Sequence, residues 1–169
     1  MTEQVVSLLR GLPAEAVAFL IATVPIAELR GAIPWALTPP PLGGGLSWQE
    51  AYIWSVMGNL LPVPFLLWLL EPLSGRLRRW GPVDRFLGWL FARTRRRGKL
   101  VERYGPLGLV LFVGVPLPVT GAWTGAVAAF IFGVPFRRAL PAIAFGVMLA
   151  GVVVTLASLG VLGAVRALF

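Results

Sequence analysis

Two charged side chains, Glu28 and Arg30, lie in an apolar stretch near the start of the chain, within VPIAELRGAIP (residues 24–34). A charge at the centre of a bilayer costs about 3 kcal/mol on insertion scales, so such residues usually serve a function. Arg30 keeps its charge and offers a planar fork of donors that suits a phosphate or a carboxylate. Glu28 can take up and release a proton. The pair therefore indicates anion binding combined with proton transfer, and a structural ion pair is the alternative.

The same segment contains residues that interrupt a helix. Pro25 and Pro34 each leave a backbone carbonyl without its helical donor, and Gly31 allows a second backbone to approach. A second segment, VPLPVTGAWTG (residues 115–125), repeats the Val-Pro-aliphatic start and the Gly-Ala pair once a single gap is allowed. Irregular backbone at bilayer depth is tolerated only where protein buries it or water reaches it. Both segments therefore indicate a pathway or a binding site.

Polar side chains near these breaks complete the set of candidate pathway residues. Asn59, in GNLLPVP, is the only amide inside its apolar block; hydrogen bonding to a hairpin tip is the alternative to substrate contact. Helix capping and packing explain the hydroxyl groups of the second segment almost as well as ligand contact does. The candidates are Glu28, Arg30, Gly31, Pro34, Asn59, Pro116, Pro118, Thr120, Gly121, Trp123 and Thr124.

The composition is that of an integral membrane protein. Hydrophobic residues make up 57% of the 169 residues, charged residues make up 13%, and the mean hydropathy is +0.82. Soluble domains are about 45–50% apolar and about 25% charged. Cysteine and histidine are absent, which excludes disulfides, thiolate nucleophiles, imidazole bases and the usual zinc ligands. With no paired carboxylates either, the sequence disfavours an enzyme, and we expect neither a metal nor a cofactor.

The net charge of +8 is concentrated in one connection. Ten of the fifteen basic residues lie between Arg76 and Arg103, which places that connection in the cytoplasm by the positive-inside rule. The tract RWGPVDRFLGWLFARTRRRGKL interleaves aromatic and basic residues, as in an amphipathic helix on an anionic leaflet. A dedicated partner or polyphosphate site is the alternative. The distribution argues against nucleic acid as a partner.

Two blocks are long enough for a transmembrane helix, which needs about 20 residues. They are residues 48–70, which carry no charge after Glu50, and residues 139–165, which carry no charge at all. Residues 104–136 are interrupted at their middle and are too short for two crossings and a turn, which need about 40 residues. We therefore expect a helical hairpin that enters the bilayer and leaves by the same side. Residues 12–37 fit the same description.

The expected fold is a single all-α membrane domain over residues 1–169, built from two repeats. Repeat 1 covers residues 12–70, a basic amphipathic connector covers residues 71–103, and repeat 2 covers residues 104–166. Gly121 follows Gly31 by 90 residues, and Gly146 follows Gly58 by 88 residues. Each repeat crosses the membrane once, so the second is inverted relative to the first. This is a common plan of secondary transporters, in which broken helices lie near the midplane.

Four segments together resemble the "small multidrug export" membrane family of bacteria and archaea. They are ELRGAIP, GNLLPVP, RYGPLGLVLFVGVPLPVTGAWTGA and FGVMLAGVVVT. That family is similar to the DedA, or VTT-domain, superfamily, whose members are described as inverted repeats of a re-entrant hairpin and a spanning helix. The resemblance implies movement of lipids such as the undecaprenyl phosphate carrier, dependent on the proton gradient. DedA proteins usually carry an arginine in the second hairpin, whereas residues 115–125 carry no charge.

The sequence thus predicts a multi-pass protein of the inner cell membrane that moves a lipid carrier phosphate or a small amphipathic solute. Export of small hydrophobic drugs and a non-transporting scaffold are the alternatives. The expected partners are lipids or amphipathic small molecules, an anionic leaflet at Arg76–Arg103, and a second copy of the chain in a homodimer.

Overall fold

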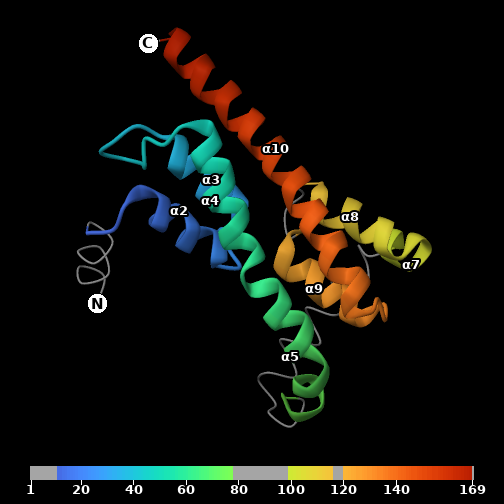
Figure 1. Cartoon of the computed structure of the whole chain (residues 1–169). Coiled ribbons are helices and arrows are strands. Elements are labelled where there is room, and N and C mark those ends of the chain that lie inside the picture. Colours follow the sequence, from blue (N-terminus) through green and yellow to red (C-terminus); the bar gives the residue numbers. More distant parts are fainter. Residues whose placement is uncertain (1–10, 78–98, 116–119, 169) are drawn as a thin grey trace. The chain divides into compact units, whose positions relative to one another are not determined.

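The computed structural model describes residues 11–77, 99–115 and 120–168 (Figure 1). Within these ranges the chain forms helices joined by short turns and contains no strand. It divides into two compact units, which we describe separately. Unit 1 consists of Met1–Asn59 and Gly151–Phe169, and unit 2 consists of Leu60–Ala150. The chain passes from unit 1 to unit 2 after Asn59, and it returns within its last helix.

Two of the described helices are long and apolar enough to cross a membrane, Trp48–Leu70 and Phe136–Ala164. The first combines α4 (Trp48–Leu60) with the start of α5 (Pro62–Leu77), and the second is most of α10 (Phe136–Leu168). Both expected spans are therefore confirmed as helices of sufficient length. α4 and α5 meet at Leu61 because Pro62 cannot donate the next helical hydrogen bond.

In unit 1, α2 (Ala14–Thr23) and α3 (Glu28–Leu37) pack against each other as a pair of helices joined by a short turn. α2 ends before Pro25, because the residue preceding a proline avoids the helical conformation; Val24 is extended, with ψ of 129°. Alanines on both helices are fully buried. Small side chains of this kind let two helices approach closely. The buried alanines are Ala18, Ala22, Ala32 and Ala36.

The loop after α3 folds back over the end of that helix. The N–H of Gly44 donates to the carbonyl of Trp35 at 3.0 Å, and the N–H of Leu46 donates to the carbonyl of Ala36 at 2.8 Å. These bonds satisfy carbonyls that a helix C-terminus leaves without a partner. α4 then begins with a capping box, in which the N–H of Ser47 donates to a carboxylate oxygen of Glu50 at 3.0 Å.

Unit 2 contains α5, α7 (Lys99–Tyr104), α8 (Pro106–Gly114), α9 (Ala122–Ile131) and the first part of α10. α9 packs against both α5 and α8. α9 ends in a Schellman motif: Gly133 has φ of 65°, and the N–H of Val134 donates to the carbonyl of Ala129 at 2.8 Å. A second pair of short helices, α8 and α9, thus lies beside the longer helix α5.

Glycines in a long apolar helix are expected to permit close helix contacts, and α10 contains four of them: Gly146, Gly151, Gly160 and Gly163. This is confirmed for Gly146, where a β-carbon would lie 2.7 Å from the Cβ of Val113, and for Gly151, where one would lie 2.8 Å from the ring of Tyr52. It is wrong for Gly160 and Gly163, because no atom of the described residues lies within 4 Å of a β-carbon at either position.

Other expectations fall outside the described residues. The predicted amphipathic helix of the basic connector lies largely on residues 78–98, and Pro116 and Pro118 lie within residues 116–119.

Candidate functional site

Glu28 is the first residue of α3, where the chain turns back from α2. Its φ of 44° lies in the left-handed region, which costs a non-glycine residue about 1–3 kcal/mol, and strained residues of this kind are enriched at functional sites. Its N–H donates to the carbonyl of Val24 at 2.9 Å. Only 8% of the surface of Glu28 is exposed. The turn thus holds a buried carboxylate in a strained backbone conformation.

Arg30 is partly exposed, whereas Glu28 is buried, so the two side chains lie on different surfaces of α3. Residues four apart share one face of a helix, so Arg30, Pro34 and Thr38 follow one another along the same side. Pro34 has no N–H and cannot bond to the carbonyl of Arg30 as an ordinary helical residue would. The Thr38 hydroxyl donates to the Pro34 carbonyl at 2.8 Å. This face therefore carries a cation at one end and a proline-interrupted turn at its middle.

Gly31 of α3 and Asn59 of α4 lie at a similar depth in unit 1, because α3 and α4 pack against the same part of α2. A β-carbon on Gly31 would lie 3.7 Å from a methyl group of Ile21, and one on Gly58 would overlap the carbonyl of Phe19. Phe19 and Ile21 are two residues apart, or about 3 Å along the helix. The structure thus brings the first broken segment and the amide of the next helix to one level.

Asn59 does not form the expected hydrogen bond to a hairpin tip through its side-chain oxygen. Asn59 is 1% exposed, and its Oδ1 has no hydrogen-bond partner among the described residues. The same holds for Oγ of Ser55, which is fully buried one turn earlier. A buried acceptor without a partner costs about 1–3 kcal/mol. Each unpartnered group in a native structure indicates strain, function or an unseen water or ion.

The directions of neighbouring contacts show where these two side chains point. On one side of α4, Gly58 faces the backbone of α2, and on the other side Tyr52 and Val56 face Gly151 of α10. On a helix with 3.6 residues per turn, Ser55 and Asn59 project between those two directions. They therefore face the interior of unit 1. Ser55 was missed at the sequence level, although its spacing of four residues from Asn59 was a usable signal.

Two polar side chains of the second broken segment form hydrogen bonds with backbone groups of the same segment. The Thr120 hydroxyl donates to the carbonyl of Val115 at 2.8 Å and closes the turn between α8 and α9. The N–H of Gly121 donates to the hydroxyl oxygen of Thr124 at 3.0 Å, which caps the start of α9. Trp123 is partly buried. The capping interpretation of Thr120 and Thr124 is therefore supported.

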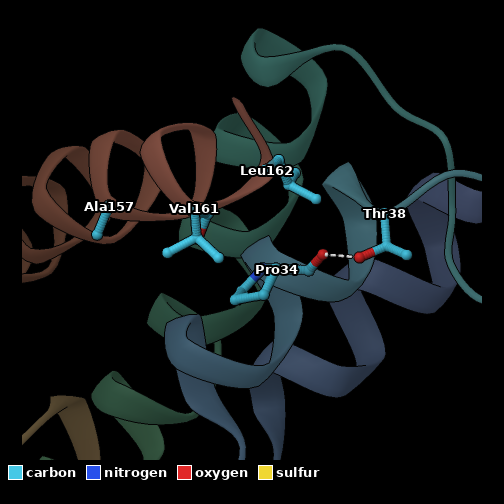
Figure 2. Close-up of a pocket in the computed structure, with 6 residues that line it drawn as sticks. Pro34, Thr38, Ala157, Val161 and Leu162 are labelled. Carbon is cyan, nitrogen blue, oxygen red and sulfur yellow. Dashed lines mark hydrogen bonds between the residues drawn. The ribbon is translucent and has the colours of Figure 1, made fainter. Parts of the chain in front are cut away.

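An apolar cavity of about 320 Å³ lies in unit 1 between α3 and the last part of α10. Figure 2 shows Pro34 and Thr38 on one side and Ala157, Val161 and Leu162 on the other. Ser158 completes the wall. No motif in the sequence indicated this cavity, because its two walls are more than 100 residues apart in the chain.

Residues 28–153 match the family described as "Putative small multi-drug export protein". The chain belongs to this family. The match begins at Glu28 and includes Asn59 and the second broken segment. No curated protein and no solved structure matches the chain.

Membership in the small multi-drug export family agrees with the resemblance noted in the sequence and with the two helices that can cross a membrane. The matched range ends before the α10 wall of the cavity, at Ala157–Leu162. Among the described residues there is no group of three or more acidic, cysteine or histidine side chains that could hold a metal ion.

Proposed function

We propose that this protein moves an anionic lipid, such as a lipid carrier phosphate, or a small amphipathic solute across the inner cell membrane, coupled to protons. In this proposal Arg30 binds the anionic group and Glu28 carries the proton. The basic connector Arg76–Arg103 lies on the cytoplasmic anionic leaflet. The protein performs no covalent chemistry on its substrate.

The observation that carries the proposal is the burial and backbone conformation of Glu28. Its side chain is buried, its φ is positive, and it is the first residue of α3 after the turn from α2. A buried ionisable side chain in a membrane protein is expensive and generally marks an ion or substrate pathway. Asn59 and Ser55 add buried oxygen atoms that have no hydrogen-bond partner among the described residues of the same unit. These atoms could accept hydrogen bonds from water or a substrate during transport.

The lengths of the paired helices support the re-entrant hairpins of the proposal. α2 and α3 have 10 residues each, α8 has 9 and α9 has 10. At 1.5 Å per residue each helix is about 15 Å long, whereas the hydrocarbon core is about 30 Å thick. A helix of this length reaches about halfway across. Such a pair can enter and leave by one side, with its turn near the midplane.

A repeated contact supports the inverted repeat of the proposal. Gly58 allows α4 to approach the backbone of Phe19 in α2, and Gly146 allows α10 to approach α8, with a β-carbon 3.0 Å from the carbonyl of Val110. Gly146 follows Gly58 by 88 residues and Val110 follows Phe19 by 91. In each unit a glycine of the long helix thus packs on the first arm of the hairpin. The similarity to the DedA superfamily implies the same arrangement.

Glu28→Gln tests the proton role in liposomes that contain the purified protein and a fluorescent lipid phosphate. An impermeant quencher reports how fast the lipid changes leaflet, with and without a pH gradient. Glutamine keeps the size of the side chain but cannot release a proton. We expect the response to the gradient to disappear while movement without a gradient remains. Glu15→Gln, in the first turn of α2, is the control and should respond normally. A full response in Glu28→Gln would exclude Glu28 as the proton carrier.

Export of small hydrophobic drugs is a second candidate function. The family description and the apolar cavity in unit 1 favour it. The two functions differ in their dependence on Arg30, because a neutral or cationic drug carries no anionic group for Arg30 to bind. Movement of a fluorescent cationic dye that is unaffected by Arg30→Ala would favour drug export.

A further inference from the structure

The wall of the cavity in unit 1 offers almost no free hydrogen-bonding groups. Its two hydroxyls are already bonded to their own helices: Thr38 donates to the Pro34 carbonyl at 2.8 Å, and Ser158 donates to the Val154 carbonyl at 2.8 Å (Figure 2 shows the first bond). The remaining wall is proline, alanine, valine and leucine. The volume of about 320 Å³ is at the small end of the range of roughly 300–1,000 Å³ for ligand sites. The cavity therefore suits an apolar group of modest size.

The cavity also opens towards an apolar surface. Val161 in its wall is 65% exposed. Val153, Ala157 and Val161 follow one another at intervals of four and so share one side of α10, a helix that is long and apolar enough to cross a membrane. A hydrocarbon chain in the bilayer could enter the cavity along this side without passing a polar group.

One turn along α3 from the cavity, the same face carries a cation. Pro34 and Thr38 line the cavity, and Arg30 precedes Pro34 by four residues. Residues at this spacing have β-carbons about 5–6 Å apart. An apolar site and a cationic residue thus follow one another along one face of α3, one helical turn apart.

We propose that the cavity binds the hydrocarbon chain of a single-chain amphipathic anion whose headgroup lies at Arg30. This inference rests on the proposed function and adds to it the position of the apolar part of the substrate. The charge of Arg30 selects an anion over a cation. A free phosphate ion would make only the Arg30 contact, and a neutral hydrocarbon would make only the cavity contact.

The site can be tested with a dodecyl phosphate that carries a photoreactive diazirine at the far end of its chain. The full-length protein is placed in nanodiscs of zwitterionic phosphatidylcholine, so that no detergent competes. After illumination, mass spectrometry locates the adducts and quantifies them. We expect the adducts on residues 34–38 and 157–162. An excess of unlabelled dodecyl phosphate should reduce them at least tenfold, and the same concentration of inorganic phosphate should reduce them less than twofold.

Val161→Trp fills the cavity and should reduce labelling at least tenfold. Val152→Trp is the matched control, because Val152 is a valine of the same helix, 45% exposed. It precedes Val161 by nine residues, or two and a half turns, and so faces the opposite side. The amount of adduct on Val152→Trp should be within twofold of that on the wild-type protein. Arg30→Gln should also reduce labelling by dodecyl phosphate at least tenfold.

Adducts of the wild-type protein spread over the exposed side of α10 around Val152 would overturn the inference, as would equal effects of the two tryptophan variants. Competition by inorganic phosphate as strong as that by dodecyl phosphate would also overturn it, because no chain site would then be needed. If labelling is as expected but no lipid moves between leaflets, the proposed function fails and the binding site stands.

Discussion

Gly58 of α4 lies directly against the backbone carbonyl of Phe19 in α2, where any larger residue would overlap that carbonyl. Gly58 is buried, and the contact sets the position of the next residue, Asn59. Because α2 also packs on Gly31 through Ile21, one glycine contact fixes the depth of Asn59 relative to the broken segment of α3. The candidate site in unit 1 depends on this contact.

Gly58→Ala should therefore destabilise the protein by about 1–3 kcal/mol, the usual cost of forcing extra volume into a packed interior. Gly160→Ala is the matched control, because Gly160 lies on a long helix with nothing within 4 Å of a β-carbon. It should stay within about 1 kcal/mol of the wild type, since alanine is the better helix former. Thermal unfolding of both variants in one detergent measures the difference. Equal midpoints would show that α4 does not pack on α2 in this way.

Asn59→Leu should leave the free energy of unfolding unchanged or raise it, and should abolish transport. The reason is that an acceptor without a partner costs about 1–3 kcal/mol, which an apolar side chain of similar size does not incur. The control is Thr155→Val on α10, which likewise removes a buried side-chain oxygen that has no partner in the described part of the chain. Thr155 is not one of the proposed pathway residues, so we expect its replacement to leave transport intact.

Unfolding measurements together with the liposome assay distinguish the outcomes for Asn59. A loss of more than about 2 kcal/mol in Asn59→Leu would mean that the amide makes structural hydrogen bonds. Normal transport in a stable Asn59→Leu would remove Asn59 from the pathway.

The sequence predicted the features that depend on length and composition. The two long helices follow from uncharged blocks of sufficient length, and the break before Pro25 follows from the restriction that a proline places on the preceding residue. The expected break at Pro34 is wrong, because α3 continues through Pro34 to Leu37 and loses only one helical hydrogen bond. Gly146 was identified correctly because a glycine in a long apolar helix usually permits a close contact. The same rule failed at Gly160, because the packing partner of a glycine depends on the tertiary fold and not on its neighbours in sequence.

The remaining features depend on how distant segments pack. The positive φ of Glu28 has no sequence signal, because glutamate rarely adopts it and the surrounding turn imposes it. The buried state of Ser55 and Asn59 without partners requires knowledge of all neighbouring helices. The cavity combines the middle of α3 with the end of α10, so no local pattern could reveal it.

Cysteine labelling tests the expected orientation of the chain, which has no native cysteine. The loop before α4 is best probed at Leu42, which is 82% exposed; Gly44 is less suitable because a β-carbon there would lie 3.2 Å from the Trp35 ring. Leu42→Cys should react with an impermeant thiol reagent added outside intact cells. Gly98→Cys, in the basic connector, should react only after the membrane is opened. Reaction of both positions from one side would contradict a single crossing by Trp48–Leu70.

Replacement of Arg30 tests the central claim most directly, by the rate at which a fluorescent lipid phosphate changes leaflet in liposomes. Arg30→Ala should abolish protein-dependent movement with an unchanged unfolding temperature, because a neutral side chain cannot offset the desolvation of a phosphate. Arg30→Lys should restore part of the rate, since it keeps the charge but loses the planar fork. Arg137→Ala, at an exposed arginine in the first turn of α10, should match the wild type. A wild-type rate in a stable Arg30→Ala protein would contradict the account.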